Sequence, residues 1–172
     1  MKNFKKYIET IASVNEKDWS VFSSLLKKRE ISKKSTFLVK GEIEDNISFI
    51  EKGEVRLFMP EAEQEKELTF GFSFQGEFIS AYDFFLTRTP SIYELEALAD
   101  TILGASPTAN YKKYTKTTSI GNTVERFISE KLFLIKSKRE QSLLNETSEQ
   151  RYLNLFKDRP KVNVYINVIN RL

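Results

Sequence analysis

Short segments with an apolar side chain at every second position fill the region from Ile31 to Ala105, and this period restricts the fold more than any other feature. The clearest segment, Leu68–Phe74, alternates large apolar side chains with small or polar ones. Such alternation is typical of a β-strand with one buried face. We therefore predict a half-buried strand whose core-facing residues are Leu68, Phe70, Phe72 and Phe74.

Glycine-containing turns separate the predicted strands. Lys52-Gly53 joins two apolar segments as a tight hairpin, and Gln75-Gly76 marks another turn. Glycine readily adopts the positive φ that such turns need. Further strands are expected at Ile47–Ile50, Val55–Phe58, Ile92–Leu98 and Ile102–Ala105. Short strands with turn signals between them predict a β-sandwich or barrel rather than a sheet of βαβ units.

Helical patterns flank the β-rich region. Asn15, followed by acidic residues, predicts a capped helix start, and Phe4 begins an earlier amphipathic segment. After the strands, Ser106-Pro107 predicts another helix start, because a proline at the first helical position loses no hydrogen bond. We expect these helices to pack their aromatic residues against the strands.

A long helix is predicted from about Ile120 to Leu144. Phe133 and Leu134 widen its apolar face beyond what one sheet covers. Such a helix is deeply buried or meets a second copy of itself. We expect a homodimer, with packing wholly on the protein's own barrel as the alternative. The expected interface residues are Ile120, Val124, Phe127, Ile128, Leu132 and Ile135.

The C-terminal part begins with a helix-capping signal. Thr147 stands three residues before Gln150, as in a capping box, and the helix should end before Pro160. From Val162 onward, apolar and polar residues alternate, which favours a strand. A natural ending, a frameshift and a fragment all fit this pattern.

The sequence contains neither cysteine nor histidine, which removes several kinds of chemistry. Disulfides, thiolate catalysis and zinc ribbons need cysteine. Imidazole-dependent triads and the His-rich metal sites of cupin-like jelly-roll enzymes need histidine. We therefore expect a protein that is not an enzyme and that holds no metal.

No membrane-directed segment is found. No apolar run approaches the roughly 20 residues that a membrane span needs. The first residues, from Met1 to Glu9, lack the apolar region of a secretory signal. We expect a cytoplasmic protein without a membrane partner.

Three stretches combine glycine turns with strand junctions. They are Phe37–Glu42, Ile47–Val55, and the run from Gly76–Ala81 through Pro90-Ser91 to Glu96–Leu98. Their order and spacing resemble the cyclic-nucleotide-binding domain of the Crp/Fnr family of bacterial transcriptional regulators. This resemblance implies a mainly β fold with flanking helices. The implied fold is a double-stranded β-helix (jelly roll) of the cyclic-nucleotide-binding type, followed by a long dimerisation helix.

The resemblance also locates a candidate ligand pocket. Family members that bind cyclic AMP present a glutamate to the ribose and an arginine to the phosphate. By the resemblance, Ala81 and Ser91 occupy these positions. A buried phosphate beside Ser91 would lack its charged partner, and Arg88 is the nearest alternative cation. We expect an empty or differently liganded pocket rather than one for cyclic AMP or a similar nucleotide. The candidate pocket residues are Gly76, Glu77, Phe78, Ile79, Ser80, Ala81, Tyr82, Pro90, Ser91 and Tyr93.

The resemblance further implies four parts. These are N-terminal helices (1–28), a cyclic-nucleotide-binding-like β-roll (29–116), a dimerisation helix (117–145) and a remnant or truncated start of the winged helix-turn-helix domain (146–172). DNA contact is then expected only through the domain that this chain lacks. The first functional hypothesis is an effector-sensing and dimerisation module of a Crp/Fnr-like transcription regulator with a degenerate nucleotide pocket. The alternative is a stand-alone module that binds a small ligand, such as a cyclic nucleotide, without binding DNA.

Overall fold

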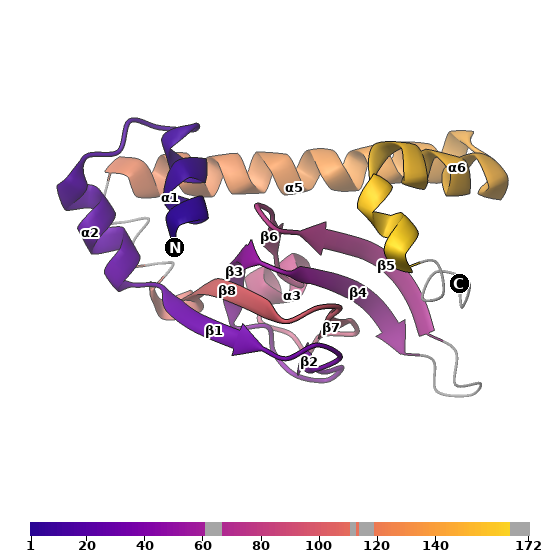
Figure 1. The fold of residues 1–172 in the computed structure, drawn as a ribbon, viewed down its shortest axis with the longest axis horizontal. Helices are drawn as coiled ribbons and strands as arrows, with labels where there is room; N and C mark the ends of the chain where they lie inside the picture. The colour runs from indigo at the N-terminus through magenta and orange to yellow at the C-terminus, as the bar shows by residue number, and fades with distance from the viewer. Residues whose placement is uncertain (61–66, 111–112, 114–118, 166–172) are drawn as a thin grey trace.

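Two antiparallel sheets of four strands each form the centre of the described molecule (Figure 1). The computed structural model describes residues 1–60, 67–110, 113 and 119–165. The first sheet has the order β1 (Lys27–Ile31), β8 (Thr101–Pro107), β3 (Asn46–Lys52), β6 (Phe78–Ile79). The second has the order β2 (Thr36–Leu38), β7 (Glu94–Ala97), β4 (Glu54–Pro60), β5 (Glu67–Phe74). The predicted β-sandwich is confirmed.

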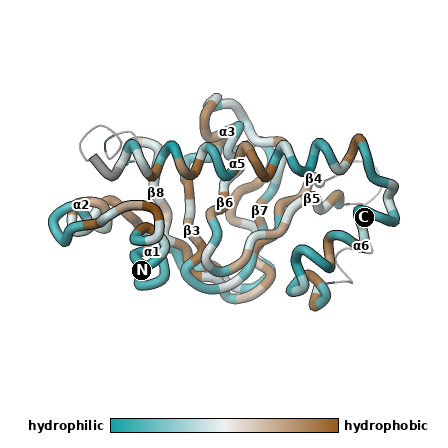
Figure 2. The backbone as a smooth tube through the Cα atoms, turned by 90° about the horizontal axis from the view of Figure 1, so that it is seen from above, coloured by the Kyte–Doolittle hydropathy of each residue, from teal (hydrophilic) through white to brown (hydrophobic). Residues whose placement is uncertain are grey.

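Helices flank the sandwich, and the longest, α5, runs along one side of it (Figure 1). The helical elements whose two ends lie in the described part of the chain are α1 (Lys2–Glu9), α2 (Glu16–Ser24), α3 (Tyr82–Thr87), α5 (Ser119–Asn145), α6 (Ser148–Asp158) and the 3-10 helix η1 (Pro160–Tyr165). Residues 108–110 are also helical. In Figure 1, α1 and α2 lie near one end of α5, and α6 lies at the other. Seen from above, α5 crosses the strands and mixes hydrophilic with hydrophobic residues along its length (Figure 2).

One apolar cluster fills the space between the sheets. Its buried members are Leu38, Ile50, Val55, Ile79, Ala81, Leu95 and Leu103. They come from both sheets and from the start of α3, because alternate residues of each strand point inward. Burial of apolar side chains from water is the main driving force of folding. Side chains therefore occupy much of the barrel interior.

A second cluster joins the N-terminal helices to the outside of the first sheet. Its buried members are Phe4, Ile8, Phe22, Phe49, Val124 and Ile128. The Phe4 ring stacks on that of Phe49 with centroids 4.5 Å apart. This cluster brings together α1, α2, β3 and the first half of α5, so the helices and the sandwich share one continuous packed body.

The predicted turns and caps are confirmed. Gly53 and Gly76 have φ values of +102° and +89° and lie in the turns that follow β3 and β5. The Asn15 side chain accepts a hydrogen bond from the Asp18 N–H at 2.8 Å. At the start of α6, Thr147 and Gln150 form the predicted capping box.

The predicted burial of β5 is wrong at its first half because of a β-bulge. Leu57 pairs with Gly71, whereas the next residue, Phe58, pairs with Thr69, which leaves Phe70 as the extra residue. A bulge shifts the alternation by one position. Accordingly, Thr69 is buried and Leu68 is 39% exposed. Phe72 and Phe74 are buried as expected, but they pack against Leu98 and Val162 and not in the cluster between the sheets.

Two other local predictions are corrected. Ser106 and Pro107 still belong to β8, where they pair with Ile47 and Asn46, and the helix expected here begins directly after them, at Thr108. A proline is tolerated at a strand end, where no ladder hydrogen bond needs its missing N–H. The predicted strand after Pro160 is instead the 3-10 helix η1 as far as Tyr165. The rest of that prediction falls on residues 166–172, which lie outside the described residues.

The burial of Val162 explains why the segment after Pro160 forms a 3-10 helix and not the predicted strand. Its side chain is fully buried against Phe72, Phe74 and Leu98. Contact with a β-strand far away in the sequence fixes the local shape here, and propensity does not. The first strand also begins at Lys27, before the expected domain boundary at residue 29.

Candidate effector pocket and dimer face

The segment from Gly76 to Tyr82 forms a turn, the short strand β6 and the entry to α3. The Gly76 N–H donates to the Ile50 carbonyl and the Ile50 N–H donates to the Glu77 carbonyl, both at 2.9 Å. Farther along, the Ser80 hydroxyl donates to the Asn46 carbonyl at 2.9 Å. The whole segment is therefore fixed to the two ends of β3.

Ser91 lies in the interior, and its hydroxyl group already has hydrogen-bond partners. The side chain is almost fully buried. Its Oγ donates to the Tyr93 carbonyl at 2.9 Å and accepts from the Tyr93 N–H at 3.0 Å. The backbone of Ser91 is bonded to Gly41 and Glu42, each at 2.7 Å. Ser91 thus stabilises its own strand entry and supplies no positive charge.

Ala81 faces a carboxylate that belongs to the protein itself. The Ala81 N–H donates to Oε2 of Glu44 at 3.3 Å, and the Asn46 N–H donates to Oε1 of the same residue at 2.9 Å. Glu44 is buried. Burial raises the pKa of Glu44, and the hydrogen bonds from Asn46 and Ala81 oppose this increase. The backbone donor at the position expected to face a ribose is therefore occupied internally.

Arg88, the alternative cation, is held outside the candidate pocket. Its Nη1 donates to the Glu44 carbonyl and to the Thr108 hydroxyl, both at 2.7 Å. Its Nη2 forms an ion pair with Asp45 at 2.8 Å. The residue has a positive φ of 61° directly after α3, which places its side chain toward the loop before β3. Arg88 therefore fixes that loop to the end of β8.

Tyr93 belongs to a cluster of aromatic rings. Its ring centroid lies 4.6 Å from that of Phe70 and 5.2 Å from that of Phe84. Burial, followed by the negative charge of Asp83, raises the pKa of Tyr93. Tyr82, by contrast, points to α5, where its hydroxyl lies 2.9 Å from the Ser129 Oγ.

The candidate pocket residues therefore divide among several environments. Ile79 and Ala81 are buried in the interior cluster, and Tyr93 packs against it. Phe78 instead contacts the rings of Phe4, Tyr7 and Phe49 outside the first sheet. The remaining placements are Glu77 beside Arg159 and Pro90 in a bridge with Ile43.

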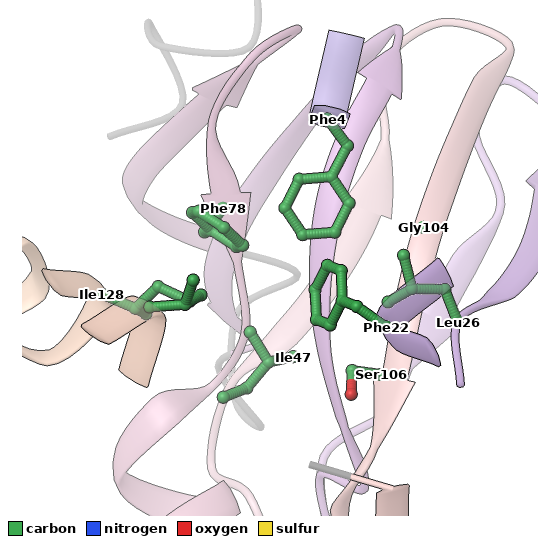
Figure 3. Close-up of a pocket in the computed structure, with 9 residues that line it drawn as sticks. Phe4, Phe22, Leu26, Ile47, Phe78, Gly104, Ser106 and Ile128 are labelled. Atoms are coloured by element: carbon green, nitrogen blue, oxygen red, sulfur yellow. The ribbon is translucent and has the colours of Figure 1, made fainter. Parts of the chain in front are cut away.

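A small cavity lies away from Ser91, under the N-terminal helices (Figure 3). Its volume is about 20 Å³, enough for a water molecule but far below the size of a nucleotide site. A larger, open hollow of about 450 Å³ lies on the surface of α1 and α2. The small cavity is lined by Phe4, Phe22, Leu26, Ile47, Phe78, Gly104, Ser106, Val124 and Ile128.

The expected dimer residues on α5 are covered to different extents. Val124 and Ile128 are buried in the protein's own core, and Leu132 packs against the same cluster. Phe127 is half-buried, with its ring centroid 6.1 Å from that of Tyr7, and Ile135 is 47% exposed. The Ile120 side chain lies outside the described residues. The first half of α5 thus mainly covers the barrel.

The second half of α5 carries exposed apolar side chains. Phe133 and Leu134 are 69% and 64% exposed, and Leu143 and Leu144 are also exposed. Sequence reasoning singled out Phe133 and Leu134 as the excess width of the apolar face, but it did not place them at the interface. No helix in the described part of the chain could span a membrane, and no acidic cluster there could hold a metal ion.

Comparison with known proteins identifies the fold. No family model and no curated protein matches the sequence. A cyclic nucleotide-binding domain from Methylobacillus flagellatus superposes with a TM-score of 0.66 at 15% identity, over 84% of this chain and 81% of that one. The fold is that of a cyclic-nucleotide-binding domain.

Bacterial regulators share this cyclic-nucleotide-binding fold. A Crp/Fnr-family regulator from Eubacterium rectale gives a TM-score of 0.63 at 16% identity, over 87% of this chain and 69% of that one. The Thermus thermophilus catabolite activator protein gives 0.62 at 17% identity, over 78% of this chain. This chain spans only 62% of the length of the Thermus protein. At these identities the likeness establishes the fold alone.

Sequence reasoning missed three side chains around this cyclic-nucleotide-binding fold. Glu44 lies in an acidic stretch, where nothing in the sequence distinguishes it from its exposed neighbours. Arg139 and Arg159 reach β5 from the C-terminal helices, donating to the carbonyls of Phe70 and Phe72. Only the arrangement of helices and strands in space reveals these partners.

Proposed function

We propose that this chain is an effector-sensing and dimerisation module of the Crp/Fnr-like type whose nucleotide pocket is degenerate. The cyclic-nucleotide-binding fold supports the first part of the proposal. The observation that carries the second part is the pair of hydrogen bonds between the Ser91 hydroxyl and the Tyr93 backbone. This position offers no cation to a phosphate.

The charge balance at Ser91 argues against a cyclic phosphodiester. A buried phosphate without a charged partner loses its hydration and gains no ion pair, at a cost of several kcal/mol. Arg88 is already committed to Asp45, Thr108 and the Glu44 carbonyl. Binding through Arg88 would first have to break all of these contacts.

Thermal unfolding in the presence of nucleotides tests the degenerate pocket. A ligand at 100 times its Kd would add about 2.7 kcal/mol of stability and raise Tm visibly. We expect no change in Tm with millimolar cyclic AMP or cyclic GMP, relative to 5′-AMP as a non-cyclic control. A rise with either cyclic nucleotide alone would overturn the degenerate pocket and favour a stand-alone nucleotide-binding module.

One cation supports the stand-alone module as a second candidate. The Arg139 guanidinium lies 5.1 Å from the centroid of the Phe70 ring, which itself contacts Tyr93. The charge of an anionic ligand beside Tyr93 would then be balanced by Arg139 of α5, and not by a residue at the position of Ser91. In that case Arg139→Gln would abolish a nucleotide-induced rise in Tm, whereas Arg126→Gln, an exposed change on the same helix, would leave it intact.

We propose that dimerisation uses the exposed second half of α5, within the expected dimerisation helix at residues 117–145. The exposed Phe133, Leu134 and Leu144 would be buried by a second copy of the helix. Light scattering after size exclusion tests this proposal. We expect a dimer for the native chain and for the exposed control Asn122→Glu, and a monomer for Leu134→Glu. A native chain that is monomeric at micromolar concentration would refute the dimer.

A further inference from the structure

Strand β5 is the last strand of its sheet, and side chains occupy its outer edge. Arg139 Nη1 donates to the Phe70 carbonyl at 2.8 Å, and Arg159 Nη1 donates to the Phe72 carbonyl at 3.1 Å. The Phe74 N–H donates to Glu77 Oε2 at 3.0 Å. An edge strand with free polar groups invites pairing with another chain, and side chains that bond these groups prevent it. Side chains from residues that follow β5 in the sequence therefore occupy hydrogen-bonding groups along its outer edge.

Arg159 connects this edge to the turn after β5. Its Nη1 lies 2.9 Å from Oε2 and 3.2 Å from Oε1 of Glu77. Glu77 also closes its own turn through the hydrogen bond from Phe74. One guanidinium therefore joins three elements: the residue after α6, the edge of β5, and the turn that leads through β6 to the candidate pocket segment.

Val162 adds an apolar contact at the same place. Its side chain is fully buried against Phe72, Phe74 and Leu98. Leu155 and Phe156 of α6 are only partly buried against this cluster. The residues from Ser148 to Tyr165 are thus attached mainly at their C-terminal end.

The rest of this segment is held weakly. No residue of α6 is buried, and Leu153 is 59% exposed. The ion pair between Lys138 and Asp158 joins α6 to α5, but both side chains are largely exposed, and exposed pairs contribute little stability. Segments with few buried contacts open locally at a lower free energy than the whole domain unfolds.

We infer that residues 148–165 form a strap that closes over the edge of β5 and opens as a unit while the barrel stays folded. The Glu77–Arg159 pair and the buried Val162 set how often it opens. Opening frees the Phe72 carbonyl and one partner of Glu77, so the strap and the Gly76–Glu77 turn move between two states together. This inference needs no effector, and it stands whether or not the proposed function is correct.

Hydrogen exchange measured by mass spectrometry on the full chain tests the strap. In Glu77→Gln and in Arg159→Gln, we expect amide exchange in residues 148–165 to become about three- to tenfold faster. Val162→Ala should accelerate the same amides. In Glu77→Gln/Arg159→Gln, exchange should be no faster than in the faster single variant, because both changes break one interaction.

Two controls separate opening of the strap from loss of the fold. Trp19, the single tryptophan, packs in the N-terminal cluster. Its fluorescence therefore shows whether the barrel and the N-terminal helices stay folded, independently of the strap. The exposed control Arg126→Gln breaks an ion pair on α5 and should leave exchange unchanged. The inference is wrong if both single variants exchange like the native chain. It is also wrong if residues 148–165 exchange only as fast as the strands, or if the two changes add fully.

Discussion

Gly53 and Thr101 approach each other so closely that no other residue fits at the glycine. A Cβ on Gly53 would lie 2.3 Å from the Thr101 Oγ1 and 2.7 Å from its Cα. The Thr101 Oγ1 donates to the carbonyl of Ala99 at 2.7 Å, so it is not free to move aside. The hairpin between β3 and β4 therefore sits directly on the start of β8.

Replacing Gly53 by alanine should destabilise the protein strongly. The added Cβ collides with Thr101, and the positive φ of +102° disfavours any side chain. We expect a loss of about 3 kcal/mol in the free energy of unfolding, measured with urea.

Gly41 provides a matched control for this substitution. It has a similar φ of +93°, but nothing lies within 4 Å of a Cβ built on it. Gly41→Ala should therefore cost only the backbone strain, about 1 kcal/mol. Equal losses for the two variants would show that the contact with Thr101 has no energetic effect.

Glu51→Ala should loosen α1 from β3. The carboxylate of Glu51 accepts hydrogen bonds from the Asn3 N–H at 2.8 Å and the Phe4 N–H at 3.1 Å, and so caps the helix from a strand. Loss of a cap costs about 1 kcal/mol. Tryptophan fluorescence during urea unfolding should detect this loss, because Trp19 packs against the same cluster as Phe4.

The control for the α1 cap is Glu16→Ala, in which the replaced carboxylate is exposed on α2. Its ion-pair partner is Lys5, and the Glu16 side chain is 84% accessible to solvent. We expect an unfolding midpoint within error of the native value. A similar loss for Glu16→Ala and Glu51→Ala would contradict a specific role for Glu51.

Arg56→Met should destabilise the second sheet. The buried guanidinium pairs with Glu67 at 2.7 Å and with Glu96 at 2.8 Å, and it lies over the Phe58 ring. Burial alone would lower the pKa of Arg56, but its two carboxylate partners outweigh this and raise it. Removal of the cation leaves two carboxylates close together, and we expect a loss of about 3 kcal/mol in urea unfolding.

Arg126→Met tests whether the loss depends on burial. Arg126 and Glu130 form an exposed pair on α5, with 75% and 63% of their side chains accessible. Such a pair contributes little, so the stability should hardly change. If Arg56→Met were equally harmless, the buried ion pairs would be energetically neutral.

Glu44 should make the protein less stable as the pH rises. Burial raises its pKa in the folded state above the ordinary value of 4.5. Between these two values the folded chain binds more protons than the unfolded chain, so the free energy of unfolding falls with increasing pH. Relative to the native protein, Glu44→Gln should therefore gain stability as the pH rises from 4.5 through the raised pKa. A constant difference across this range in urea unfolding would refute it.

The sequence alone predicted the elements that depend on neighbouring residues. Apolar periods located the strands and the long helix, Gly53 and Gly76 located turns, and Thr147 located a helix start. Each of these signals acts within a few residues, through backbone conformation or a local hydrogen bond. The resemblance also predicts Ser91 at the position where family members present an arginine, and this prediction remains untested.

The tertiary structure decided which partners these elements find. Phe70 is the extra residue of a β-bulge, Ser106 and Pro107 belong to a strand, and Val162 is buried in a 3-10 helix. The Glu44 carboxylate is buried beside Ala81, and Arg88 is directed away from Ser91. These outcomes depend on strand register and on which element covers which face. Both are set by contacts between residues far apart in the chain, which a local pattern does not encode.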